Sequence, residues 1–309
     1  MPSALACPAS LKGVLRASAA AAALVEGFAL AGVEAVALPV ADGGEGTLDA
    51  LSTGRGGEWH EADVEDAFGR PRRARWLVRA DGTAIVEAAE AIPLDPERRD
   101  VHAASSRGLG LLLRAVGRPV RVLVALGGTA TMDAGAGLLD VLDALPAPTV
   151  VACDVDATLL DAPRLFGPQK GASTKDVLAL ESRFRGAGLE RVADLPGSGA
   201  AGGLGAALAS LGAALVPGAS LVLDELGFEP AGYDVVVTGE GTVDATTARG
   251  KAPGEVARRC AAAAVRCVVF GGRVVEPLPN AETVALSGDP ARARDDLRAL
   301  GARLARDLG

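Results

Sequence analysis

One short segment places two carboxylates and three glycines in a single bend, Ala41-Asp42-Gly43-Gly44-Glu45-Gly46-Thr47. Two carboxylates at this spacing repel each other unless a cation or a hydrogen-bond donor lies between them. The glycines let backbone N–H groups approach a bulky ligand without a Cβ in the way. An apolar run, 33–40, comes directly before the bend and predicts a buried strand. A strand, an acidic glycine loop and a helix in this order favour a site for Mg²⁺ and phosphate, and a tight surface turn with solvated acids is the alternative.

Five further segments also combine polar side chains with glycines, and most of them follow a predicted strand. They are 8–13, 105–110, 127–135, 154–156 with 166–172, and 238–244 with 250–253. Carboxylates suit Mg²⁺, lysines and helix N-termini suit phosphates, and a further carboxylate can accept a proton from a substrate hydroxyl. Because position 245 is alanine, no Walker A loop precedes Gly250-Lys251, and no dinucleotide fingerprint follows the first strand. The combination indicates phosphoryl transfer.

Lysine is rare in this chain and is mostly found beside glycine. Lys and Arg together number 31, yet only Lys12, Lys170, Lys175 and Lys251 are lysines. All but Lys175, which lies at a predicted helix start, adjoin a glycine. A lysine is a compact point charge that arginine does not replace, so the lysines beside glycine are candidates to reach a phosphate or a carboxylate.

The candidate site residues come from these segments. Asp42, Asp133, Asp154 and Asp244 are the candidates for catalysis, and Asp42 and Glu240 are the candidate metal ligands. Asp133 and Asp154 are equally suited to cap the helix that follows each of them. Ser105 and Ser106 have the same alternative, and Gln169 has the alternative of closing a turn. The candidate substrate- and phosphate-binding residues are Ser10, Lys12, Gly43, Gly44, Glu45, Ser105, Ser106, Thr129, Gln169, Lys170, Glu240 and Lys251.

Composition excludes several other classes of protein. The chain has 309 residues, of which 49% are hydrophobic and 23% charged, as is typical of a globular protein of two domains or one large one. A net charge of −8 argues against nucleic acid as a partner. No apolar run is long enough to cross a bilayer, and the alanine-rich stretch 17–24 predicts the first helix of the fold and no cleaved leader. Four cysteines without a C-x-x-C pair predict a reducing cytoplasm.

The pattern of apolar runs predicts an α/β fold with two domains. Runs at 4–7, 33–40, 121–126, 149–153, 234–238, 265–270 and 283–286 are typical of parallel strands with crossover helices. Alternating runs at 58–64, 73–79 and 83–88, with Asp81-Gly82 between the last two, predict antiparallel strands. Residues 1–56 and 215–309 are expected to form a five-stranded parallel sheet domain, interrupted by an inserted mixed α/β domain at 57–214. The loops 8–12, 41–47 and 239–244 are expected to face that domain across a cleft.

Four motifs, taken in order, resemble the bacterial class I glycerate kinases over nearly the whole chain. They are Ala41-Asp42-Gly43-Gly44-Glu45-Gly46-Thr47, Phe166-Gly167-Pro168-Gln169-Lys170-Gly171-Ala172, Gly199-Ala200-Ala201-Gly202-Gly203-Leu204-Gly205 and Thr238-Gly239-Glu240-Gly241. The resemblance implies a flavodoxin-like domain with a second α/β domain. It also implies transfer of the ATP γ-phosphoryl group to D-glycerate with Mg²⁺, giving 2-phosphoglycerate. The expected partners are therefore D-glycerate and ATP, with no nucleic acid and no membrane, and a homodimer is left open as the assembly.

The chain departs from the pattern of this family at several positions. Ala9 stands where the first loop of the family has an acid, Met132 and Ala134 replace family residues around Asp133, and Thr242 and Thr246 replace an arginine and a glutamine. The chain is also shorter than typical members between positions 139 and 149. Either these changes leave an active kinase, or they mark a non-catalytic or repurposed relative that binds a small hydroxy acid or a nucleotide.

Overall fold

The computed structural model describes residues 2–308, and the chain divides into two compact units within them. The first unit comprises residues 2–42, 49–56 and 219–308, and the second comprises 43–48 and 57–218. The acidic glycine loop therefore changes unit within itself, because Asp42 belongs to the first unit and Gly43, Gly44 and Glu45 belong to the second.

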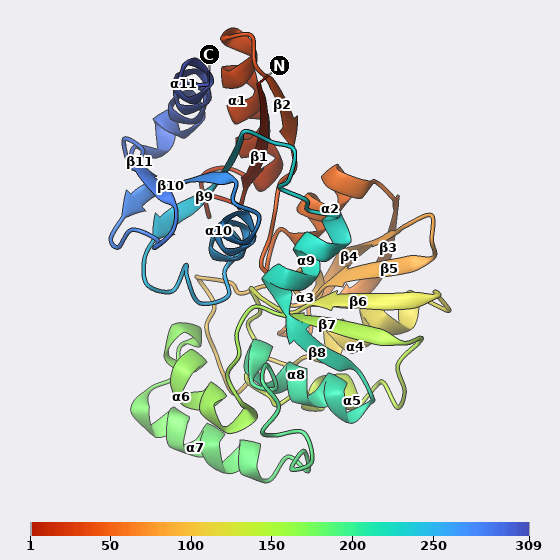
Figure 1. The fold of residues 1–309 in the computed structure, drawn as a ribbon. Helices are drawn as coiled ribbons and strands as arrows, with labels where there is room; N and C mark the ends of the chain where they lie inside the picture. The colour runs from red at the N-terminus through yellow and green to blue at the C-terminus, as the bar shows by residue number, and fades with distance from the viewer. Residues whose placement is uncertain (1, 309) are drawn as a thin grey trace. The chain divides into compact units, whose positions relative to one another are not determined.

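A parallel five-stranded sheet forms the centre of the first unit (Figure 1). Its strands are β1 (Ser3–Pro8), β2 (Glu34–Ala37), β9 (Val235–Val243), β10 (Arg266–Val274) and β11 (Glu282–Ala285), in the order β11-β10-β9-β1-β2. Counted along the unit, this is the flavodoxin-like order 2-1-3-4-5. The predicted parallel α/β architecture is confirmed, and the order places a switch point between β1 and β9.

Helices cover both faces of this sheet. On one face α1 (Ala17–Leu30) and α11 (Ala293–Arg306) lie side by side (Figure 1) and pack with alternate residues of β1, β9 and β10. Glycines permit their close crossing, because a Cβ on Gly27 would lie 2.1 Å from the carbonyl oxygen of Arg298. On the other face, Cys260 of α10 (Ala252–Ala262) lies against Cys7 and Cys267 of the strands. The remaining helices are α2 (Thr47–Arg55) and α9 (Gly218–Leu226), with a short 3₁₀ turn, η3 (Pro290–Arg292).

Two predictions about this sheet are wrong. The run 33–40 was expected to form a buried strand, but β2 is a four-residue edge strand that pairs only with β1, and Val36 is largely exposed. Residues 239–244 were expected to form a loop, but β9 continues through Val243, paired with β10. Gly239 is needed there for close approach, because a Cβ would lie 2.2 Å from the carbonyl oxygen of Phe270.

The second unit is built on a mixed six-stranded sheet. Its strands, in spatial order, are β3 (Glu58–Glu65), β4 (Pro71–Val78), β5 (Thr83–Glu87), β6 (Arg121–Ala125), β7 (Thr149–Cys153) and β8 (Ala214–Pro217). The first two pairs are antiparallel and the last three are parallel, so the predicted mixed sheet and its hairpins are confirmed. Sequence reasoning missed β8, which is short and partly exposed at the sheet edge.

Short helices connect the strands of the second unit. They are α3 (Ala88–Ala91), α4 (Arg107–Ala115), α5 (Ala136–Leu139), α6 (Ala162–Phe166), α7 (Thr174–Arg185) and α8 (Ala200–Ser210), with the 3₁₀ turns η1 (Leu159–Asp161) and η2 (Pro168–Lys170). One apolar core packs against the sheet, and a smaller one, which includes Met132 and Phe184, lies under α6 and α7. In residues 2–308 no helix has the length and apolar character that a membrane crossing requires.

Candidate active site

In the second unit the acidic glycine loop lies directly against two strand-end segments. A Cβ on Gly127 would lie 2.4 Å from the Cα of Gly44 and 2.7 Å from Oδ2 of Asp154. The N–H of Gly127 also donates to the carbonyl oxygen of Gly43 at 3.2 Å. Gly127 and Asp154 directly follow the ends of β6 and β7, which are neighbours in the sheet. The carboxyl ends of parallel strands thus bring three of the predicted segments together, and only glycine fits where they meet.

A buried carboxylate that sequence reasoning missed holds this loop in place. Glu87, at the end of β5, accepts hydrogen bonds from the backbone N–H groups of Gly46 (3.1 Å) and Leu48 (3.0 Å). Only 5% of Glu87 is exposed, and burial raises its pKa to about 7. The two N–H groups oppose this rise, whereas the nearby carboxylates of Glu90 and Glu45 add to it. The sequence feature that could have identified Glu87 is a single acidic residue at the end of an apolar strand.

Asp133 lies at the centre of a closed hydrogen-bond network. Its carboxylate accepts from the backbone N–H and hydroxyl of Ser106 (both 2.8 Å) and from the N–H groups of Gly135 and Gly137 (both 3.1 Å). The hydroxyl of Ser106 in turn accepts from the N–H of Leu138 at 2.9 Å, and does not cap α4. The alternative role of Asp133, that it caps the helix after it, fits these bonds, because Gly135 is the N-cap residue of α5 and Gly137 lies in the first turn.

Lys170 brings a buried positive charge to the same loop. The residue is 5% exposed, and its Nζ donates to the carbonyl oxygen of Thr131 at 2.9 Å. Burial lowers the pKa of Lys170 to about 8, although the carboxylates of Asp154 and Asp133 act in the opposite direction. Lys170 is therefore within electrostatic reach of two predicted catalytic aspartates.

The glycine motif 199–205 supports the acceptor of Lys170. Ala201, Gly202 and Gly203 have left-handed backbone angles inside α8, and a Cβ on Gly202 would lie 2.0 Å from the carbonyl oxygen of Thr131. The hydroxyl of Thr131 donates to the carbonyl oxygen of Ala201 at 3.2 Å. This motif therefore packs against the Thr131 carbonyl group that accepts from Lys170.

Thr129 is the second unusual polar group of this region. The residue is 2% exposed, and within residues 2–308 its buried hydroxyl oxygen has no hydrogen-bond partner. A buried hydroxyl without a partner costs about 1–3 kcal/mol of stability. Such a group is usually completed by a water or a ligand.

The other predicted residues of the second unit are closer to solvent. Glu45 is exposed and lies beside Gly128, because a Cβ on Gly128 would lie 3.2 Å from the Cβ of Glu45. Gln169 is exposed on η2, and the hydroxyl of the half-buried Ser105 accepts from the N–H of Arg107 at 3.3 Å.

The first unit has its own cluster around Glu240. The carboxylate accepts from the hydroxyl of Thr247 at 2.7 Å and pairs with Nζ of Lys251 at 3.2 Å. Burial raises the pKa of Glu240, and these two donors oppose the rise while the charge of Asp42 adds to it. Glu240 thus pairs with Lys251 and interacts with Asp42, which is distant from both in sequence.

Asp244 closes a turn next to this cluster. Its carboxylate accepts from the N–H and the hydroxyl of Thr246, at 2.8 and 2.5 Å, and these bonds hold its pKa below the usual range. The N–H of Asp244 donates to the hydroxyl of Thr247 at 3.0 Å. Asp244 therefore orders Thr247, which in turn holds Glu240.

Ser10 and Lys12 follow β1 in the first unit. Ser10 is half-buried, and Lys12 is exposed in the turn 12–14, which the bridge between Leu11 and Leu15 closes before α1 begins. Lys12 also lines a hollow of about 500 Å³, together with Arg273, which was not among the predicted residues.

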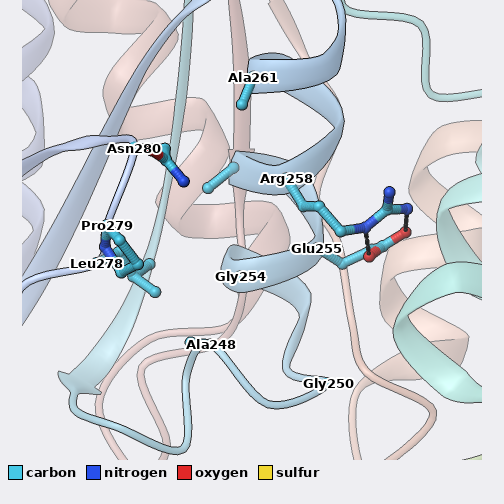
Figure 2. A pocket seen from close by; sticks show the side chains of 10 residues that line it. Ala248, Gly250, Gly254, Glu255, Arg258, Ala261, Leu278, Pro279 and Asn280 are labelled. Carbon is cyan, nitrogen blue, oxygen red and sulfur yellow. Dashed lines mark hydrogen bonds and ion pairs between the residues drawn. The ribbon is translucent and has the colours of Figure 1, made fainter.

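A second hollow in the first unit, of about 230 Å³, lies between α10 and the segment 278–280 (Figure 2). Figure 2 shows Asn280 and Pro279 on one side of it, and Glu255 and Arg258 bonded to each other on the helix. The two bonds of that ion pair measure 2.6 and 2.7 Å. Because its two charges neutralise each other, this hollow is less suited to an anion than the one beside Lys12.

Both α/β units place carboxylates, lysines and glycines at the carboxyl ends of parallel strands. This arrangement is typical of α/β enzymes that act on small molecules. The model of the glycerate kinase family matches residues 4–147 and 145–288. The chain is 36% identical to glycerate 2-kinase of Escherichia coli over 299 residues, covering 80% of this chain and 78% of that one. It is 34% identical to glycerate kinase of Bacillus subtilis over 330 residues, covering 86% and 84%.

A solved structure agrees with these matches. The crystal structure of a Salmonella typhimurium LT2 protein, assigned as glycerate kinase 2, superimposes with a TM-score of 0.82 and 28% identity, covering 99% of this chain and 98% of that one. The chain belongs to the glycerate kinase family, and the resemblance inferred from its motifs is confirmed.

The departures from the family pattern fall at different depths. Met132 is fully buried in the smaller core of the second unit, so its side chain fills space among apolar groups. Thr246 completes the turn with Asp244. Ala9 keeps a backbone bond from its N–H to the carbonyl oxygen of Gly239 at 2.9 Å, which joins the end of β1 to β9.

Proposed function

We propose that this protein is an ATP-dependent glycerate kinase that phosphorylates D-glycerate and gives 2-phosphoglycerate. Membership of the family supports the reaction class, and the name of the Escherichia coli relative supports the 2-position. The observation that carries the proposal is the buried ammonium group of Lys170, which interacts electrostatically with Asp154 and Asp133. A buried charge with a shifted pKa beside strand-end loops is typical of a functional site.

The general base is most simply assigned to Asp154. Asp154 lies against Gly127 and within electrostatic reach of Lys170. In this proposal Asp154 accepts the proton of a glycerate hydroxyl. The hydroxyl oxygen then attacks the γ-phosphorus of ATP, the bond from that phosphorus to the β,γ-bridging oxygen breaks, and ADP leaves.

Lys170 and Thr129 are proposed to bind the anionic acceptor. Lys170 supplies a positive charge in a buried setting, where electrostatic attraction is stronger than in water. The Thr129 hydroxyl supplies a hydrogen bond that the described residues leave unused. Gly43 and Gly44 bring backbone close to Asp154 without a Cβ, and Glu87 fixes the loop that contains them.

Asp42 and Glu240 are proposed to hold Mg²⁺ with the nucleotide. Their charges interact, and Mg²⁺ is usually held by one or two carboxylates together with substrate phosphates. No group of three His, Cys, Asp or Glu residues suited to a metal occurs in the described chain, so the residues fit a nucleotide-bound ion better than an all-protein cage. When bound, Mg²⁺ neutralises charge on the phosphates. Lys251 and Thr247 orient the carboxylate of Glu240 and oppose the rise that burial causes in its pKa.

A coupled assay for ADP with D-glycerate and ATP tests the reaction, and ³¹P NMR of the product tests the position. We expect turnover and 2-phosphoglycerate. Asp154→Asn is expected to abolish turnover while the protein stays folded, whereas Asp133→Asn should mainly lower the melting temperature. Ligand-induced stabilisation without any phosphorylated product would instead support the non-catalytic relative, and recovery of activity in Ala9→Asp would then identify the lost acid as the cause.

The cellular setting is also a proposal. A cytoplasmic location is supported by the four cysteines, which are all buried free thiols as expected in a reducing compartment. The homodimer stays a prediction, and light scattering of the purified protein tests it.

A further inference from the structure

The hollow beside Lys12 lies at the edge of the first unit's sheet where ligands usually bind. Its lining comes from the segment after β1, the last residues of β9 and β10, and the segment after β11. In open parallel sheets, ligands bind outside the carboxyl ends of the strands, near the switch in strand order. Its volume of about 500 Å³ is in the range of small-molecule pockets.

Bare backbone forms part of this hollow. A Cβ on Gly272 would lie 2.9 Å from the carbonyl oxygen of Gly241, and one on Gly288 would lie 3.4 Å from that of Gly272. A Cβ on Gly241 would lie 3.9 Å from the backbone nitrogen of Lys12. Three glycines from different segments therefore meet side by side, and they leave space that side chains would fill.

Two cationic side chains, Lys12 and Arg273, line the hollow. In the part of the chain that the structure describes, neither Lys12 nor Arg273 has an ion pair or a side-chain hydrogen bond. The two acids in the lining, Asp289 and Asp296, already accept hydrogen bonds from backbone N–H groups. Asp289 accepts from the N–H of Ala291 at 3.0 Å, and Asp296 accepts from the N–H of Ser287 at 3.0 Å. The available charge in this hollow is therefore positive and suits an anion.

The same hollow has an apolar wall, which selects among anions. Val14, Leu286 and Pro290 line it together with the buried Leu11. Glycerate is a three-carbon acid with a polar group on every carbon, and it would gain little from such a wall. A nucleoside polyphosphate has both a flat apolar base and several negative charges.

We propose that this hollow binds the adenine nucleotide, with Lys12 and Arg273 facing its phosphates and the wall of Val14, Leu286 and Pro290 facing its base. The inference rests on the proposed function, because that function supplies ATP as the ligand. It adds Arg273 as a binding residue and assigns the nucleotide to the first unit.

Calorimetric titration of the full chain with ADP, without glycerate, tests the assignment. Arg273→Met and Lys12→Met should each weaken ADP binding roughly tenfold or more, since each variant loses a charged hydrogen-bond donor to a phosphate. Val14→Trp should weaken it by filling the hollow. Arg303→Met is the matched control, because Arg303 is exposed on α11 and outside the hollow, and it should leave ADP binding unchanged.

Two fragments of the nucleotide separate the parts of the hollow. Adenosine binding should fall in Val14→Trp and hold in Arg273→Met, whereas tripolyphosphate binding should fall in Arg273→Met and Lys12→Met. Unchanged ADP affinity in all three folded variants would overturn the assignment, even if the wild-type protein phosphorylates glycerate. Conversely, the expected ADP pattern in a protein that fails to phosphorylate glycerate would support the hollow and contradict only the proposed function.

Discussion

The two units hold their charged groups in opposite ways. In the second unit Lys170, Glu87 and Asp133 are buried, and each is fixed by backbone groups of neighbouring segments. In the first unit Lys12 and Arg273 are exposed and line an open hollow, and Lys251 is only partly buried. The second unit therefore has the fixed charges of a preorganised site. The first unit has exposed positive charges, which suit the phosphates of a flexible anionic ligand.

This difference has a direct electrostatic consequence. Charges in a buried setting interact strongly and are little affected by salt, whereas exposed charges are screened within about 8 Å at physiological ionic strength. Small changes to the buried groups of the second unit should therefore cause large losses of activity. Changes to exposed charges in the first unit should weaken ligand binding moderately, and added salt should weaken it in the same way.

The largest effect is expected from Lys170→Met. The variant removes a buried charge beside Asp154 and leaves the Thr131 carbonyl without its donor. We expect kcat/KM to fall by roughly 10²–10³ or more, as when one preorganised donor of an active site is removed. Lys175→Met, an exposed lysine on α7, should retain full activity. Steady-state kinetics with D-glycerate make the comparison, and equal losses in both variants would contradict a special role for Lys170.

The pH dependence of the wild-type protein provides a second test of Lys170. Its pKa is about 8 in the folded protein, against 10.5 for an unperturbed lysine, so the unfolded chain binds more protons between these values. Stability should therefore increase with pH from about 8 to 10.5, while activity that needs the ammonium group falls above pH 8. Both trends should disappear in Lys170→Met. Parallel loss of stability and activity in the wild type would show that simple unfolding is the cause.

Gly127→Ala should produce the next largest loss. The added Cβ must displace Gly44 or Asp154, which lie 2.4 and 2.7 Å from its position. A displacement of about 1 Å in a catalytic group can cost about 10²-fold in rate. Gly186→Ala is the control, because there a Cβ would meet nothing closer than 3.7 Å. If kcat for Gly127→Ala matches that of Gly186→Ala, the meeting of the three segments has no catalytic role.

Much of the fold could be predicted because hydrophobic periodicity determines it locally. The strand 149–153 matches β7 to the residue, and Asp81-Gly82 marks the hairpin between β4 and β5. The errors have a common physical origin, which is tertiary contact. Gly239 lies in an extended strand because Phe270 needs its space, and nothing local distinguishes that glycine from one in a loop.

The candidate site was partly predictable for a similar reason. Lys170 was predicted as a phosphate contact because lysine is scarce and lies beside glycine, and in the structure it is buried and within electrostatic reach of Asp133 and Asp154. Asp133 was a candidate for catalysis with helix capping as the alternative, and its carboxylate accepts from backbone N–H groups of two segments, donors that carry no sequence signature. Glu87 was missed because its partners are likewise backbone N–H groups.

Glu87→Gln should change stability more than activity. The pKa of Glu87 rises from 4.5 to about 7 on folding, so the folded protein binds more protons between these values. The contribution of Glu87 to stability should be fully present below pH 4.5 and decline as the pH rises through 7, by about 3 kcal/mol at 1.36 kcal/mol per pKa unit. Glutamine keeps one acceptor and no charge, so the variant should lose this decline. Chemical denaturation across pH measures it, with the exposed Glu190→Gln as control.

The smallest effect, and the one that most sharply separates ligand binding from folding, is expected from Thr129→Val. Valine has nearly the shape of threonine and lacks the hydroxyl, which is buried and has no partner in residues 2–308. Removing an unsatisfied buried group should stabilise the protein by about 1–3 kcal/mol, whereas KM for D-glycerate should rise about tenfold if the hydroxyl binds substrate. Thr131→Val is the matched control, because that hydroxyl already donates to Ala201 and its loss should lower stability. If Thr129→Val is stabilised and its KM is unchanged, the Thr129 hydroxyl binds a buried water and not glycerate. Of the two groups of the second unit that are proposed to bind glycerate, only the buried charge of Lys170 would then remain.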